Sequence, residues 1–130
     1  MDSLIATWTP RLLSILRIVS AFLFVEHGTQ KWLALPVAPA RPTVLMSLSG
    51  VAGMFELCGG FLLLLGLFTR PVAFVLSGLM AFAYFIAHEP VDFWPIVNKG
   101  ELAVLYCFVF LYLAAAGGGP WSVDRWLRHK

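Results

Sequence analysis

The chain has 130 residues, of which 60% are hydrophobic and 12% are charged, and its formal net charge is +2. An ordinary soluble domain carries about 25% charged residues, and a soluble protein of this size could not bury so much apolar surface. The composition therefore predicts a single integral membrane domain over residues 1–130. The small net charge and the lack of a basic patch with interleaved aromatics exclude nucleic acid as a partner.

Four apolar stretches approach the ~20 residues that a membrane-spanning helix needs. Pro36, Pro39 and Pro42 follow the first stretch and predict an extended connection, and the glycines of residues 117–119 end the fourth. No useful length of strand alternation is present, and open sheets do not span lipid. The expected fold class is all-α, an antiparallel up-down four-helix membrane bundle. Its spans are residues 10–35, 43–68, 71–88 and 99–116.

A short amphipathic helix is predicted after the bundle, over residues 122–129. Ser122 suits the N-cap position and Asp124 the first turn. The tryptophans and the leucine alternate with basic residues, which is typical of a helix lying on the membrane surface. The residues concerned are Trp121, Arg125, Trp126, Leu127, Arg128 and Lys130.

The distribution of basic residues predicts the orientation of the spans. Four spans place both termini on one side, and the side with more lysine and arginine is normally cytoplasmic. The terminal side has the larger number, so we expect both termini in the cytoplasm. The terminal side holds Arg11, Arg70, Arg125, Arg128 and Lys130, and the other side holds Lys31, Arg41 and Lys99.

Two ionisable residues are expected near mid-membrane, Arg17 and Glu56. A charge there costs at least ~2.5–3.5 kcal/mol on insertion scales, so such groups turn away from lipid. Glu56 shares a stripe with Ser49, Gly53 and Gly60, and small residues let a second helix approach closely. We expect Arg17 to pair with Glu56, or Glu56 to be protonated and hydrogen-bonded. The pair would either fix helix register or form a proton- or redox-coupled site.

A second polar cluster is expected at the outer ends of the helices. A helix-end salt bridge between Lys31 and Glu101 is the favoured interpretation there. Histidines beside carboxylates could hold zinc or iron, but no H-x-x-H or E-x-x-H spacing occurs on one helix, so no metal site is predicted. The cluster comprises Glu26, His27, Lys31, His88, Asn98 and Glu101.

In the fourth span, helical spacing puts Glu101 on one stripe with Leu105, Phe108 and Tyr112. We expect this stripe to face the other helices. We interpret the aromatic residues of the spans as core and interfacial packing. No nucleophile set, phosphate loop, haem motif or dinucleotide-binding motif is present. The sequence predicts no catalytic residue and leaves open whether the chain is an enzyme.

Several motifs, in this order and spacing, resemble the DoxX family of small four-helix bacterial membrane proteins. The closing GGGPWSVD is similar to the family's Gly-Pro-Gly and Ser-Leu-Asp ending, with the glycines placed differently and Val123 in place of leucine. The resemblance implies a bacterial inner-membrane protein, often linked to respiratory or redox enzymes. The namesake is a subunit associated with quinone-reducing sulfur oxidation. The matching elements are Arg17, HGTQK (residues 27–31), FELCGGFLLLLGLFTR (55–70), GELAVLY (100–106) and GGGPWSVD (117–124).

The leading hypothesis is a membrane subunit, without catalytic residues of its own, that supports a quinone-linked or detoxification oxidoreductase. His27, Lys31, His88 and Glu101 would line an outward pocket for a quinone headgroup, and aromatics would flank the tail. Membrane lipid, a redox enzyme or further copies of the chain are the expected partners. Two alternatives stay open: a small-molecule transporter, and a scaffold or assembly factor. The apolar run of residues 62–68 argues against a continuous polar pathway.

Overall fold

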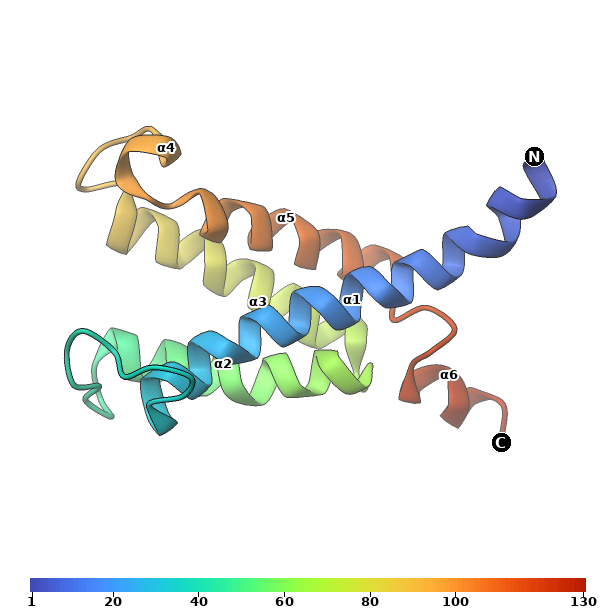
Figure 1. The fold of residues 1–130 in the computed structure, drawn as a ribbon, viewed down its shortest axis with the longest axis horizontal. Helices are drawn as coiled ribbons and strands as arrows, with labels where there is room; N and C mark the ends of the chain where they lie inside the picture. Colours follow the sequence, from blue (N-terminus) through green and yellow to red (C-terminus); the bar gives the residue numbers. More distant parts are fainter.

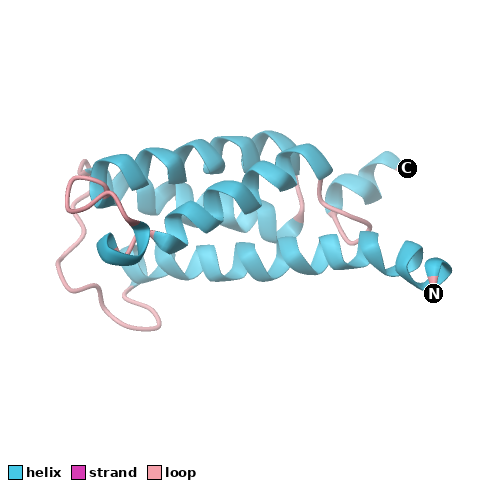
Figure 2. Cartoon of the chain, turned by 90° about the horizontal axis from the view of Figure 1, so that it is seen from above, coloured by secondary structure: helices cyan, strands magenta, loops and turns pink.

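The computed structural model describes all 130 residues, and every regular element in it is helical. Four long helices run side by side, and two short helices lie near their ends (Figures 1 and 2). Both termini lie at one end of the bundle, whereas α4 and the connection between α1 and α2 lie at the other (Figure 1). The expected all-α bundle is confirmed. The long helices are α1 (Asp2–Leu33), α2 (Leu48–Leu65), α3 (Thr69–Ala83) and α5 (Glu101–Ala116), and the short ones are α4 (Pro95–Asn98) and α6 (Val123–Arg128).

The surface of the bundle is that of a membrane protein. The helix α1, the helix α2 and the continuous segment Thr69–His88 are long and apolar enough to cross a bilayer, whereas α5 is apolar but has 16 residues. Large apolar side chains cover the outer faces; Phe74, for example, is 65% exposed and Phe108 is 63% exposed. Soluble monomers rarely expose contiguous apolar surface on this scale.

Helix starts differ most from the sequence expectation. The first helix begins at Asp2, not residue 10, and it continues through Pro10. The second begins at Leu48, not residue 43, because the Ser47 hydroxyl caps it by accepting the Gly50 N–H at 3.0 Å. The fourth long helix ends at Ala116 as expected, and the next residue, Gly117, has a φ of 86°.

The long helices pack most extensively as two pairs, α1 on α2 and α3 on α5. Glycines at the first contact let the backbones meet: a Cβ on Gly28 would lie 2.7 Å from the Leu57 amide nitrogen, and one on Gly60 would lie 2.8 Å from a Val25 methyl. This confirms that the small residues of α2 face a neighbouring helix. Ser49, at the outer end of the same stripe, is exposed.

The centre of the bundle is an apolar layer in which aromatic rings meet edge to face. The ring of Phe24 in α1 lies 5.1 Å from Tyr106 and 4.9 Å from Phe110, centroid to centroid. The face of α5 that packs inward is therefore the one holding Tyr106 and Phe110. The stripe of Leu105, Phe108 and Tyr112 points outward with more than half of each side chain exposed, so the expectation that it faces the other helices was wrong.

Candidate ligand-binding site

Arg17 is fully buried, and its partners are backbone carbonyls, not a carboxylate. The last carbonyls of a helix have no partner within the helix and carry partial negative charge, so they suit a guanidinium. Arg17 thereby joins α1 to the end of α2 and to the loop before α6. The expected pairing of Arg17 with Glu56 is wrong. The acceptors are Gly118 O (2.9 Å), Leu63 O (2.5 Å), Leu64 O (2.7 Å) and Trp121 O (2.6 Å).

Glu56 pairs with Lys31 at the other end of the bundle. The Lys31 Nζ lies 2.8 Å from both carboxylate oxygens, and the Glu56 side chain is only 7% exposed against 23% for Lys31. The close approach at Gly28 and Gly53 brings α1 and α2 together at this level. The expected salt bridge between Lys31 and Glu101 is wrong, because Glu101 is exposed in the first turn of α5 and has no ion partner.

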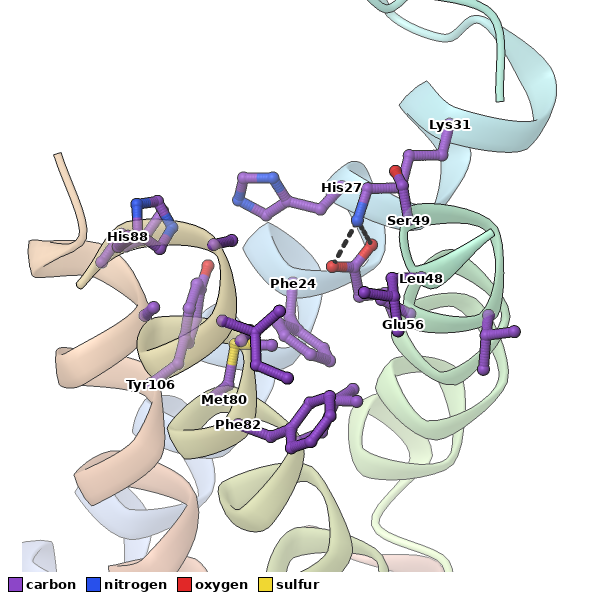
Figure 3. A pocket seen from close by; sticks show the side chains of 18 of the residues that line it. Phe24, His27, Lys31, Leu48, Ser49, Glu56, Met80, Phe82, His88 and Tyr106 are labelled. Carbon is purple, nitrogen blue, oxygen red and sulfur yellow. Dashed lines mark hydrogen bonds and ion pairs between the residues drawn. The ribbon is translucent and has the colours of Figure 1, made fainter. Parts of the chain in front are cut away.

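This ion pair lies in the wall of a pocket of about 650 Å³ that opens among α1, α2, α3 and α5 (Figure 3). Thirteen of its nineteen lining residues are hydrophobic, so the pocket suits a mostly apolar ligand. Its size falls within the ~300–1,000 Å³ typical of small-molecule sites. The apolar wall includes Phe24, Leu79, Met80, Phe82, Ile86 and Leu102.

Tyr106 supplies an unpartnered polar group to this pocket. Its side chain is 5% exposed, and its hydroxyl has no hydrogen-bond partner in the protein. In Figure 3 the hydroxyl points toward the end of the pocket that carries His27 and His88. A buried hydroxyl without a partner costs about 1–3 kcal/mol. The position of Tyr106 is therefore that of a group able to bond to a ligand.

Two histidines frame the same end of the pocket. The ring of His27 lines the pocket and lies edge-on to Tyr106, at 6.3 Å between centroids. The His88 Nδ1 lies 3.1 Å from the Asn98 carbonyl oxygen. Only an N–H can bond to a carbonyl, so neutral His88 presents its Nε2 as an acceptor.

A π-helical turn, η1 (Tyr84–His88), positions His88. The turn is closed by the Glu89 N–H, which donates to the Tyr84 carbonyl at 2.9 Å. Such turns are rare and occur frequently at functional sites. The inserted residue rotates the end of α3 relative to a regular helix, and it sets the direction in which His88 leaves the backbone.

Asn98 belongs to the support of the site and does not line it. The Asn98 side chain is buried, donates to Asp92 O at 2.7 Å and to the Tyr84 hydroxyl at 3.2 Å, and accepts from the Gly100 N–H at 2.7 Å. The Tyr84 hydroxyl in turn donates to the Phe93 carbonyl. These bonds hold the loop between η1 and α5 in place.

Of the residues proposed from sequence, four line this pocket: His27, Lys31, Glu56 and His88. Glu26 and Glu101 lie outside it, and Arg17 lies at the far end of the core. No three His, Cys, Asp or Glu side chains are close enough to share a metal ion. The arrangement offers hydrogen-bond donors and acceptors at one end and apolar walls along the rest.

Sequence reasoning missed Tyr106 and Lys99, both of which line the pocket. A signal for Tyr106 existed, because Ala103, Tyr106, Phe110 and Leu113 recur at helical spacing and all are buried. The fourth span is apolar on every side, so two stripes were equally plausible from the sequence.

Comparison with known proteins agrees with this architecture. The family model described as DoxX matches residues 12–89. An uncharacterized protein of Haemophilus influenzae is 44% identical over an alignment 128 residues long, and the alignment covers 91% of this chain and 92% of that protein. No solved structure shows significant similarity. The chain therefore belongs to the DoxX family of membrane proteins.

Proposed function

We propose that this chain is a small inner-membrane subunit that binds a quinone or a similar aromatic amphiphile in the pocket and presents it to a redox enzyme. The observation that carries the proposal is the buried, unpartnered Tyr106 hydroxyl at the polar end of a largely apolar cavity. Ligand sites generally combine apolar walls with a few convergent polar groups. This pocket has that composition.

The residues at the polar end fit both redox states of a quinone. A quinone carbonyl accepts a hydrogen bond, for which the Tyr106 hydroxyl is available. A hydroquinone hydroxyl donates one, for which the His88 Nε2 is available. The quinone would supply two-electron chemistry when bound, and the side chains of this chain would orient its ring. Phe24, Phe82 and Met80 would contact the apolar part.

The packing below the pocket supports binding over permeation. From the pocket wall toward Arg17 the core is a layer of apolar side chains that are 0–1% exposed: Phe24, which lines the pocket, and Leu63, Phe110 and Leu113. A transport pathway for a polar substrate needs a continuous polar lining, and this layer interrupts it. Flux of substrate through proteoliposomes that is lost in Glu56→Gln would favour the transport alternative.

The substitution Tyr106→Phe tests the proposal. The hydroxyl has no protein partner, so we expect the ligand-free variant to be as stable as the wild type or slightly more stable. Removing one neutral hydrogen bond to the ligand should weaken binding of a short-chain quinone by about tenfold. Quenching of intrinsic tryptophan fluorescence in detergent micelles measures the affinity.

The matched control is Tyr112→Phe, which removes the same hydroxyl from the outward face of α5, where Tyr112 is 54% exposed. This variant should bind the quinone as the wild type does. Equal affinity in Tyr106→Phe and the wild type would rule out the assigned contact. Absence of quinone and of any redox enzyme from material extracted in mild detergent would argue against the whole proposal.

The orientation follows from charge. The end of the bundle that holds both termini carries Arg11, Arg70, Arg125, Arg128 and Lys130, as the bounds of α1, α3 and α6 show, and we assign this end to the cytoplasm. The pocket would then open in the outer half of the inner membrane. A partner enzyme would meet it there, either from the outer surface or within the bilayer.

A further inference from the structure

A second pocket, of about 340 Å³, lies at the opposite end of the bundle from the first and is strongly basic. Only one of its nine lining residues is hydrophobic, which makes it a poor site for an apolar ligand. Its basic members come from two separate parts of the chain, the start of α3 and the tail helix α6 with the residue that follows it. They are Arg70, Arg125, Arg128 and His129, beside Gly118 and Ser122.

The arginines of this pocket have no carboxylate partner. The molecule holds a single salt bridge, between Lys31 and Glu56 at the other end. The nearest acid in sequence is Asp124, and both its carboxylate oxygens already accept backbone N–H groups, those of Phe68 and Thr69, at 2.8 Å. Asp124 offsets only part of the positive charge, through its interaction with Arg128, so a pocket lined by three arginines keeps a net positive charge.

The guanidinium donors of the pocket are mostly free. Arg70 uses its Nη1 on the carbonyls that end α5, and its Nε lies 3.5 Å from where a Cβ on Gly117 would stand, so the glycine leaves room for it. Arg128 uses only its Nε, on the Asp124 carbonyl at 3.3 Å. Arg125 makes no side-chain hydrogen bond. A guanidinium group with free N–H donors can bind two oxygens of a phosphate group at once.

The surroundings indicate where such a phosphate comes from. Trp121, Trp126 and Leu127 are each more than half exposed beside the pocket, and apolar side chains of this kind embed at the boundary between headgroups and acyl chains. Tryptophan is enriched at that depth. The arginines beside them would then stand at the level of the lipid phosphates.

We propose that this pocket binds the phosphate headgroup of an anionic phospholipid, such as phosphatidylglycerol, and thereby fastens the tail helix to the membrane. The site is separate from the quinone pocket and does not depend on the function proposed for that pocket. Basic pockets beside membrane helices bind anionic headgroups, and each lysine or arginine near an anionic surface contributes about 1 kcal/mol. The bound lipid would connect Arg70 of α3 to Arg125 and Arg128 of α6.

Lipid retention tests this assignment. The full chain is reconstituted into nanodiscs of equal parts phosphatidylglycerol and phosphatidylcholine, and the lipids that stay bound on release are counted by native mass spectrometry. The wild type should retain phosphatidylglycerol in preference to phosphatidylcholine. The preference should fall about fivefold in Arg125→Gln and about 25-fold in Arg125→Gln/Arg128→Gln. Arg125→Gln removes no hydrogen bond or salt bridge within the protein, so folding should be unaffected.

The control is Arg11→Gln/Arg41→Gln, which removes the same charge without touching the pocket and should keep the preference. A similar loss in the control, or an undiminished preference in Arg125→Gln/Arg128→Gln, would overturn the proposal. Inorganic phosphate forms the second arm. If millimolar phosphate displaces the retained lipid and protects the protein from thermal unfolding as well as phosphatidylglycerol does, the pocket is a free-phosphate site and the lipid assignment is wrong.

Discussion

Arg17 and Lys31 lie on one side of α1, and the chain stabilises these two cations in different ways. Arg17 spreads its charge over backbone carbonyls at the end of α2 and in the loop after α5. Lys31 instead forms a salt bridge with one carboxylate, that of Glu56. A guanidinium presents several donors in a fixed fork, whereas an ammonium is a compact point charge. The carbonyl cluster therefore requires arginine, and the ion pair does not.

We expect Lys31→Met to destabilise the fold more than Glu56→Gln does. The methionine variant leaves Glu56 buried and unpaired, and breaking a buried pair from one side costs about 3 kcal/mol or more. The glutamine variant leaves a neutral amide beside a lysine that can still reach water. Unfolding in mixed SDS micelles, followed by tryptophan fluorescence, measures both.

The control for this prediction is the double variant Lys31→Met/Glu56→Leu, which removes both charges and should recover most of the lost stability. Equal stability of Lys31→Met and the wild type would show that the ion pair does not hold α1 against α2.

At the scale of elements, the tail helix α6 secures the turn between α2 and α3. The carboxylate of Asp124 in α6 accepts hydrogen bonds from the N–H groups of Phe68 and Thr69, and the backbone N–H of Asp124 donates to Gly66 O at 2.9 Å. Phe68 has a φ of 50°, a conformation that non-glycine residues adopt only when their surroundings hold them there. Asp124, in the first turn of α6, thus caps the N-terminus of α3. The expected N-cap Ser122 is confirmed, because its hydroxyl accepts the Arg125 N–H at 3.3 Å.

Stability should therefore depend on pH through Asp124. Burial by itself raises the pKa of this carboxyl. Hydrogen bonds from Thr69 and Phe68 and the charge of Arg128 lower the pKa, and together they outweigh burial, so the pKa lies below the ordinary 3.8. The folded state thus favours the charged form. The stabilisation is complete above the unfolded pKa and is lost as the pH falls through the lower, folded pKa.

Asp124→Asn should cost about 1 kcal/mol at neutral pH, the usual contribution of a helix cap. Thermal unfolding between about pH 7 and pH 2 should show a difference between the wild type and the variant that is constant down to about pH 4 and then shrinks as the pH falls toward and through the folded pKa. A constant difference across that range would mean that the charge of Asp124 does not contribute.

The contact between α1 and α2 depends on Gly28, where a methyl group would meet the backbone of α2. Backbone atoms cannot move aside as a flexible side chain can, so we expect Gly28→Ala to destabilise the bundle by about 1–3 kcal/mol. Gly78 in α3 has nothing within 4 Å of the corresponding position. Gly78→Ala should be neutral or stabilising by up to about 1 kcal/mol. The same unfolding assay compares the two, and equal losses would contradict the close approach.

At the scale of the whole molecule, the apolar centre separates two polar ends with different chemistry. At one end a carboxylate, two ammonium groups, two imidazoles and a phenol lie around an apolar cavity, and at the other end arginines lie around a loop of glycines. The helices pack mainly as two pairs, α1 with α2 and α3 with α5. The cavity lies between these two pairs and is lined by residues of both.

The basic end predicts the topology. A fluorescent protein fused to the C-terminus should mature and fluoresce in the bacterial cytoplasm, and alkaline phosphatase fused at the same point should stay inactive. The opposite pair of results would place the termini outside the cell and the first pocket in the cytoplasmic half of the membrane.

The sequence by itself determined the membrane class, the all-α fold and the ends of several helices. These properties follow from composition and from local signals, such as Ser122 before α6 and the glycines after α5. The small-residue stripe of α2 was equally readable, because helical periodicity alone puts Gly53, Glu56 and Gly60 on one face.

Only the tertiary structure decided which charges meet and which face of α5 turns inward. The partner of Glu56 depends on how far α1 slides along α2, and a shift of a few turns exchanges Arg17 for Lys31 without altering the pattern of either helix. The face of α5 was undetermined because that helix is apolar all round, so lipid and core offer its side chains nearly the same environment. The orphan hydroxyl of Tyr106 became visible only once its neighbours were in place.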